Sequence, residues 1–180
     1  MMQAQPSPAI WPNTRSASLS FRPIGDSDIP FLSALYASTR MEELAQTGWP
    51  ETAKRDFLNQ QFLAQHQHYM RHYPGAQWLI VECDAAAAGR LYFVHWPQEI
   101  RIIDIALMPE ARGKGFGTAL LEDIIEDAIS AGKAVSIHVE RMNPALSLYR
   151  RLGFQEIEDK GVYLLMEHPG GQADPTHTII

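Results

Sequence analysis

Residues 106–125 read ALMPEARGKGFGTALLEDII, in which three glycines (Gly113, Gly115 and Gly117) lie between an apolar run and an amphipathic one. The first turn of a helix has backbone N–H groups without partners, and together with the helix dipole they favour an anion such as a phosphate. Three positions without a side chain allow that anion to approach the main chain directly. The segment therefore predicts a phosphate site at the start of a helix.

Positive charge accompanies the glycines, because Arg112 and Lys114 flank the first of them. Two cations at one rim suit a ligand that carries more than one phosphate. Without further context, a glycine-rich turn with solvated cations is an equally good interpretation. The phosphate loop of nucleoside triphosphatases is excluded, because its pattern GxxxxGK[ST] requires a hydroxyl residue where Gly115 follows Lys114.

Two other glycine patterns remain. The dinucleotide pattern GxGxxG is met at Gly113 and Gly115, and Glu140 ends the next predicted strand, where a ribose-binding acid would lie. That pattern fails at Thr118, and the residues MPEA separate the preceding strand from the glycines, so no tight strand-to-helix turn is left. The pattern [RQ]xxGx[GA] is met in full by residues 112–117.

Hydrophobic periodicity predicts one α/β domain with a mixed sheet, at residues 18–168, between flexible tails at residues 1–17 and 169–180. Strands are predicted at residues 19–25, 76–84, 89–96, 99–108, 134–140, 154–159 and 161–168. Helices are predicted at residues 26–39, on both sides of a break at 48–50, after the glycines up to Gly132, and at 144–152. The strand at 134–140 follows a helical crossover, so it should pair in parallel with the strand at 99–108.

Composition limits the class of protein. No apolar stretch of the 180 residues approaches the roughly 20 needed to span a membrane. A formal net charge of −6 disfavours nucleic acid as a partner and mildly favours a cationic one. A single cysteine, Cys83, excludes an intrachain disulfide and fits a reducing compartment, and no signal peptide is recognised, so we expect a cytoplasmic protein. No metal site is predicted.

The pattern at residues 112–117 is followed, one helix and one strand later, by NPALSLYRRLGF at residues 143–154. In this order the two segments resemble the Gcn5-related N-acetyltransferase superfamily. The resemblance spans residues 19–167 and is carried by residues 106–154. It implies a mixed central sheet with splayed parallel strands flanked by helices, with acetyl-coenzyme A as cosubstrate. The acceptor would be an amine of a small molecule or peptide that attacks directly in a ternary complex.

The resemblance also implies roles for individual residues. The pyrophosphate of coenzyme A would be bound by the loop residues Arg112, Gly113, Lys114, Gly115, Phe116, Gly117 and Thr118. Main-chain groups of Leu107 and Met108 would pair with the pantetheine arm. Asn143 would bind the pantetheine amides, although an Asn before Pro is also a good N-cap. Tyr149 matches the usual general acid, although a tyrosine at this spacing could equally be a core residue.

The general base is less defined by the sequence. Asp104 interrupts an apolar strand, so we expect it to be paired, at a sheet edge or functional, as a base acting through water or as a site for a cationic acceptor. His95, near the end of the hairpin strand, could face the acceptor cleft. His138 is more typical of a neutral strand histidine.

The resemblance places the acceptor pocket at the first helices, where Glu42, Glu43 and Trp49 could hold a cation through charge and an aromatic face. Solvated helix charges and a core tryptophan are the alternative interpretation. Two other functions stay open: a coenzyme A-binding module without transfer chemistry, and a dinucleotide-binding oxidoreductase. The sequence does not name the acceptor, which could be a polyamine, an amino acid, an antibiotic amine or a protein amine. A homodimer is an alternative to a monomer.

Overall fold

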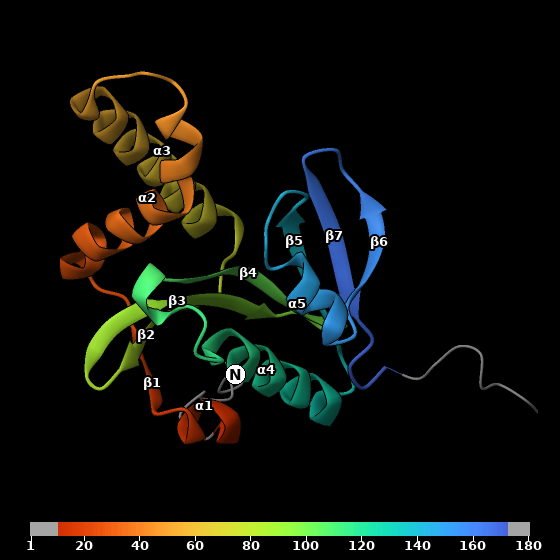
Figure 1. Cartoon of the computed structure of the whole chain (residues 1–180). Coiled ribbons are helices and arrows are strands. Elements are labelled where there is room, and N and C mark those ends of the chain that lie inside the picture. The colour runs from red at the N-terminus through yellow and green to blue at the C-terminus, as the bar shows by residue number, and fades with distance from the viewer. Residues whose placement is uncertain (1–10, 173–180) are drawn as a thin grey trace, which may run out of the picture.

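The computed structural model describes residues 11–172, which form one mixed sheet with helices on both faces (Figure 1). The strands are β1 (Leu19–Pro23), β2 (Gln77–Cys83), β3 (Ala86–His95), β4 (Glu99–Leu107), β5 (Ala134–Glu140), β6 (Gln155–Asp159) and β7 (Tyr163–His168). The helices are α1 (Pro12–Ser16), α2 (Ile29–Ala45), α3 (Glu51–His72), α4 (Phe116–Ala131) and α5 (Leu146–Arg151), with 3₁₀ turns η2 (Asp26–Asp28) and η3 (Pro109–Ala111).

The seven strands lie in the order β1-β2-β3-β4-β5-β7-β6. Only β4 and β5 run in parallel, from Glu99 opposite Ala134 to Ile102 opposite Ile137. This is the pairing expected for a strand that is reached through the crossover helix α4. The predicted α/β fold with a mixed central sheet is confirmed.

The two parallel strands separate after Ile102 and Ile137, where their pairing ends. On its other side β4 pairs with β3, and the register shifts there: Tyr92 lies opposite Asp104, whereas Phe93 lies opposite Ile102. The extra residue, Ile103, makes a β-bulge, and a bulge bends its strand and increases the local twist. The second half of β4 therefore stays in the sheet with β3 while it diverges from β5.

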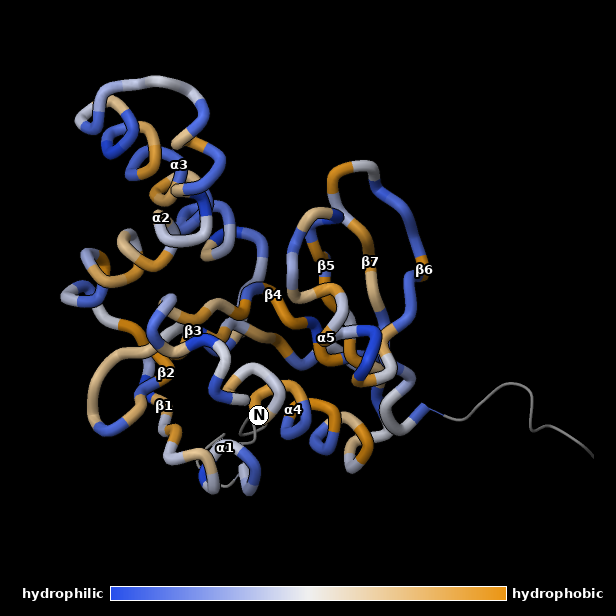
Figure 2. The backbone as a smooth tube through the Cα atoms, in the orientation of Figure 1, coloured by the Kyte–Doolittle hydropathy of each residue, from blue (hydrophilic) through white to orange (hydrophobic). Residues whose placement is uncertain are grey.

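Two hydrophobic cores hold the helices against opposite faces of the sheet. Helix α4 packs on one face through a stripe of buried residues: Leu120, Leu121, Ile124, Ile125 and Ala128. Helices α2 and α3 cover the other face through Leu32, Tyr36, Leu44, Leu58 and Phe62, which pack against Ile80 of β2. Figure 2 shows the same division, because the apolar stretches of the helices turn toward the sheet and their polar stretches turn outward.

The N-terminal segment corrects the sequence prediction of a flexible tail through residue 17. Residues 11–17 form α1 and its flanks, and Trp11 is only 3% exposed, packed against Phe21 and Phe93. Its indole N–H donates to Asp127 on α4 at 2.7 Å. The prediction missed this because five residues are too short for a periodic pattern.

At the other end, the domain also continues past the predicted boundary at residue 168. The backbone N–H of Gly171 donates to the carbonyl of Lys133 at 3.0 Å, which ties residues 169–172 to the start of β5. The remaining parts of the predicted tails, residues 1–10 and 173–180, lie outside the described residues. Between residues 11 and 172, no helix combines the length and the apolar character that crossing a membrane requires.

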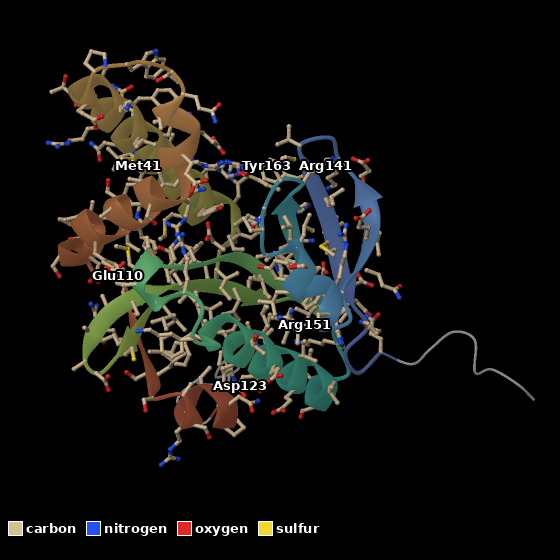
Figure 3. All side chains as sticks on the ribbon, viewed as in Figure 1. Met41, Glu110, Asp123, Arg141, Arg151 and Tyr163 are labelled. Carbon is tan, nitrogen blue, oxygen red and sulfur yellow. The ribbon has the colours of Figure 1, made fainter. Side chains whose placement is uncertain are left out.

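Asp123 on α4 fixes the N-terminal segment and lies beside α1 in Figure 3. It is 1% exposed and accepts hydrogen bonds from the backbone N–H groups of Asn13 and Thr14 at 3.1 and 2.8 Å. Asp123→Ala leaves both donors without a partner, so we expect the free energy of unfolding to fall by about 2–3 kcal/mol in urea titrations. Ser130→Ala on the exposed side of α4 is the control, with an expected change within about 0.5 kcal/mol. Equal stability of the two variants would contradict the role of Asp123.

Candidate active site

A cavity of about 970 Å³ opens where β4 and β5 diverge. Its loop side is formed by Arg112, Gly113 and residues 115–118, the end of β4, and the segment from Asn143 through α5. Its helix side is formed by α2, α3 and the sheet face that these helices cover. Twelve of the residues predicted from the sequence line this one cavity: Glu42, Glu43, Asp104, Leu107, Arg112, Gly113, Gly115, Phe116, Gly117, Thr118, Asn143 and Tyr149.

The glycine loop, residues 112–117, has the geometry of an anion site. Gly113 and Gly115 have φ angles of 72° and 81°, which residues with a side chain rarely adopt. A Cβ at either position would meet no atom within 4 Å, so the space in front of the loop is open. The N–H groups of Gly113, Lys114 and Gly115 bind no other described residue. Gly115 is the N-cap of α4, so the N–H groups of the first helical turn and the helix dipole favour an anion at this end of the helix.

The two loop cations occupy different positions. Arg112 lines the cavity, and its Nε donates to the carbonyl of Leu107 at 3.0 Å, so its guanidinium is held at the end of β4. A second nitrogen of Arg112 donates to Ser38 on α2 at 3.3 Å. Lys114 lies outside the cavity lining, although it belongs to the same loop.

The diverging part of β4 presents an open edge to the cavity. Because pairing with β5 ends at Ile102, residues 103–107 have no strand partner on that side. Leu107 lies on this edge and lines the cavity. Met108 does not: its N–H donates to the carbonyl of Ala88 at 2.8 Å, and its own carbonyl accepts from Ala111 at 2.9 Å. The predicted main-chain contact at Met108 is therefore already used within the protein.

Asn143 and Tyr149 reach the cavity from the segment after β5. The side-chain carbonyl of Asn143 accepts from the N–H of Ala145 at 2.9 Å, so it caps the turn before α5 while its amide N–H₂ stays free. Tyr149 is 4% exposed, and its hydroxyl makes no hydrogen bond with the described residues. Burial, with a further contribution from the charge of Asp104, raises the pKa of Tyr149. The phenol therefore stays protonated and can act as a proton donor.

Asp104 is held in a buried polar network on the helix side. Its Oδ2 accepts from Arg90 at 2.8 Å and from the hydroxyl of Tyr69 at 2.9 Å. Arg90 also donates to Gln65 on α3 at 2.9 Å. Burial and the adjacent carboxylate raise the pKa of Tyr69, so it remains a donor to Asp104. Oδ1 of Asp104 has no protein partner within residues 11–172, and Asp104 lines the cavity.

His138 is the third polar group on this side of the sheet. Burial, and next the charge of Arg101, lower its pKa, so the ring is neutral at pH 7. Its Nδ1 lies 3.4 Å from a guanidinium nitrogen of Arg101. That contact requires Nδ1 to be the acceptor, so the proton is on Nε2. His138 lines the cavity as a neutral hydrogen-bond donor.

An ion pair crosses the open end of the cavity from α2 to β5. The guanidinium of Arg40 contacts both carboxylate oxygens of Glu140, at 3.0 and 2.5 Å. Glu43 lies 3.4 Å from the same guanidinium, and Glu42 also lines the cavity. The hydrogen bond to Glu140 raises the pKa of Arg40, which is a cation at any working pH. Tyr163, at the end of β7 nearest α2 and α3, completes this end (Figure 3).

Two predicted acceptor residues lie elsewhere. His95 was placed at the acceptor cleft, but it pairs with Ile100 near the start of β4, at the opposite end of the strand from Leu107. Trp49 lies between α2 and α3, where it packs edge-on against Phe57 at 5.3 Å and is 42% exposed, so it is neither a core residue nor part of the lining. Neither position could be excluded from the sequence, because both depend on how distant elements pack.

Several site residues were missed by the sequence analysis, above all Arg40, Tyr69 and Arg90. Arg90 had a usable signal: it is a charge inside the apolar strand β3, the same feature that pointed to Asp104 on β4. Two opposite charges that interrupt adjacent strands are a candidate pair. Arg40 and Tyr69 are ordinary polar residues of helices, and no local pattern marks them.

The described residues contain no group of three or more His, Cys, Asp or Glu side chains arranged to hold a metal ion. The residues that line the cavity offer hydrogen bonds and charge. The glycine loop can bind phosphate groups, the open edge of β4 can bind an amide-containing chain, and Tyr149 can donate a proton beside that edge. Oδ1 of Asp104 can accept a hydrogen bond from a cation in the same cavity.

Comparison with known proteins finds a matching family and solved structures with a similar fold. The family described as "Acetyltransferase (GNAT) family" matches residues 38–154. Among solved structures, the chain resembles a PaiA N-acetyltransferase from Thermoplasma acidophilum in complex with coenzyme A, with a TM-score of 0.62 and 18% identity over 84% of this chain and 98% of that one. It also resembles the ribosomal-protein-S18-alanine N-acetyltransferase from Escherichia coli, with a TM-score of 0.55 and 18% identity over 89% and 99% of the two chains. No curated protein sequence matches this chain.

Proposed function

Because this chain belongs to the acetyltransferase (GNAT) family, we propose that it transfers an acetyl group from acetyl-coenzyme A to a primary amine by direct attack in a ternary complex. One observation carries the proposal: the open glycine loop, the unpaired edge of β4 and the free hydroxyl of Tyr149 all line one cavity. These are the three features that a phosphorylated thioester donor requires.

Donor binding follows from the loop side of the cavity. The pyrophosphate would lie against the N–H groups of Gly113 and Gly115, in the space that a side chain would otherwise fill. Arg112 adds charge at this rim, and Lys114 adds charge in the same loop from outside the cavity lining. The pantetheine amides would pair with the β4 edge near Leu107 and with the free amide of Asn143.

The transfer step requires a neutral amine, a fixed thioester and an acid for the leaving sulfur. The amine nitrogen attacks the carbonyl carbon, the C–N bond forms, and the C–S bond breaks. Before the attack, the ammonium held by Asp104 loses one proton to water. As the C–S bond breaks, Tyr149 donates its phenolic proton to the departing sulfur. The single proton that the nitrogen then loses on becoming an amide passes through water to the phenolate and restores the phenol. Asp104, which is already paired with Arg90, serves to hold the incoming ammonium.

A module that binds coenzyme A without transfer would need the loop side of the cavity alone. The free carboxylate oxygen of Asp104 and the polar lining of the helix side favour an enzyme over such a module. The dinucleotide alternative is less favoured, because η3 separates β4 from the glycines and the tight strand-to-helix turn is absent.

The test of the function is thiol release from acetyl-coenzyme A in the presence of amines. We expect one class among small amines, amino acids, aminoglycosides and peptides to stimulate release above an amine-free blank, with the acetylated amine found by mass spectrometry. Binding of coenzyme A without stimulation by any amine would support the module. Thermal protection by nicotinamide cofactors, without protection by coenzyme A, would revive the dinucleotide alternative.

The glycine loop is tested by Gly115→Glu, which places bulk and a negative charge where the pyrophosphate would lie. We expect the affinity for coenzyme A to fall by more than about tenfold, which corresponds to about 1.4 kcal/mol, in calorimetric titrations. Gly132→Glu is a matched control, since Gly132 ends the same helix with φ of 66° and equally open space, outside the cavity. Equal affinities of the two folded variants would remove the loop assignment.

Tyr149 is tested by its replacement with Phe, which removes the hydroxyl and keeps the ring in the core. Since the hydroxyl has no protein partner, we expect unchanged stability and donor affinity, while kcat falls by about 100-fold or more. In the natural chain, the raised pKa of Tyr149 predicts no loss of rate from its ionisation below about pH 10. Turnover equal to that of the unmodified chain at every pH would show that Tyr149 only packs.

A further inference from the structure

The charges in the cavity are divided between its two sides. On the loop side, the charged lining residues are Arg112 and Arg151, and no carboxylate accompanies them. On the helix side, the charged lining residues are Arg40, Glu42, Glu43, Arg90, Asp104 and Glu140. Four carboxylates there face two guanidiniums, a net charge of −2, and His138 adds none because its pKa is lowered. The loop side suits phosphates, and the helix side suits the opposite charge.

Both guanidiniums on the helix side are already neutralised by carboxylates. Arg90 is 3% exposed and bound to Asp104 and Gln65. Arg40 binds both oxygens of Glu140, and its unpaired Nε is buried in the protein. A carboxylate on the acceptor would therefore have to displace Glu140 and approach further acids. An anionic or zwitterionic acceptor is disfavoured at this end.

Open carboxylate oxygens, in contrast, remain at two separate depths. Deep in the cavity, Oδ1 of Asp104 has no partner within residues 11–172, because Tyr69 and Arg90 both donate to Oδ2. At the open end, Glu42 and Glu43 add charge beyond the Arg40–Glu140 pair, and the side chain of Glu43 is 67% exposed. The ring of Tyr163 adds an aromatic face there, which favours an ammonium group.

We infer that the acceptor is a small aliphatic amine that carries a second cationic group. Asp104 holds the reacting nitrogen, and the acids at the open end hold the second cation. This inference deepens the proposed acetyl transfer and rests on it. The second cation is bound by Glu42, Glu43 and the outer face of the Glu140 carboxylate, which Arg40 keeps in place.

The strand register sets a lower limit on the spacing of the two cations. The last β4–β5 pair joins Ile102 and Ile137. Asp104 lies two residues past that pair, with Ile103 taken up by the bulge, whereas Glu140 lies three residues past it on the diverging strand β5. At about 3.3 Å per residue, the offset of two residues amounts to roughly 7 Å along the strands, and the divergence of the strands adds to it. A linear diamine therefore needs at least four or five carbons.

The experiment compares three acceptors of equal chain length at fixed acetyl-coenzyme A: 1,5-diaminopentane, pentylamine and 5-aminopentanoate, followed by thiol release. We expect kcat/KM to be at least about tenfold higher for the diamine than for either of the others. Because charge carries the preference, it should shrink as the ionic strength rises. Equal or better use of pentylamine or of the amino acid would overturn the inference and leave the transferase intact, whereas no release with any amine class would overturn both.

Variants locate the second cation. Glu42→Gln combined with Glu43→Gln should lower the ratio of kcat/KM for diamine over monoamine by about tenfold, mainly through KM for the diamine. Glu110→Gln removes an exposed acid outside the cavity and is the matched control, for which the ratio should be retained. A ratio that is unchanged in the double variant, or that falls equally in the control, would contradict the assigned site.

Discussion

The separation of β4 from β5 after Ile102 and Ile137 is the constraint on which the rest of the structure depends. Up to that point the two strands share a ladder, and beyond it each has one edge without a strand partner. Exposed backbone polar groups are costly unless water or a ligand satisfies them. The bulge at Ile103 creates this open edge while β3 keeps β4 in the sheet. The cavity, the approach of α2 and the position of α5 all follow from it.

Two ion pairs hold the surroundings of this opening. Arg90 and Asp104 join β3 to β4 beneath α3, and both are nearly buried. Burying an ion pair costs desolvation energy, so the pair contributes less to stability than to fixing one geometry. Here that geometry leaves one carboxylate oxygen of Asp104 without a partner among residues 11–172. Arg40 and Glu140 join α2 to β5, across 100 residues of sequence. The first pair shapes the floor of the cavity, and the second sets the width of its open end.

The two sides of the cavity are built in different ways. The loop side comes from two short segments that each follow a strand, so a few consecutive residues carry its chemistry: free N–H groups, an open edge and a capped turn before Tyr149. The helix side is assembled from α2, α3 and the strands β3, β4, β5 and β7, which are far apart in the sequence. The proposed donor binding therefore depends on local segments of the chain. The proposed selection of the acceptor depends on the packed fold.

The sequence by itself determined the loop side and the order of the elements. Three local features predict these elements: glycines at a helix start, a strand pattern on either side, and Asn143 before Pro144. Each acts through neighbouring residues, so local rules are enough to predict the elements. Only the tertiary structure decided the helix side. In the folded chain, His95 lies at the far end of the sheet and Trp49 lies outside the cavity. Trp11 packs on α4, and Arg40 pairs with Glu140. Long-range pairing depends on how whole helices dock on the sheet, and no stretch of sequence encodes that docking on its own.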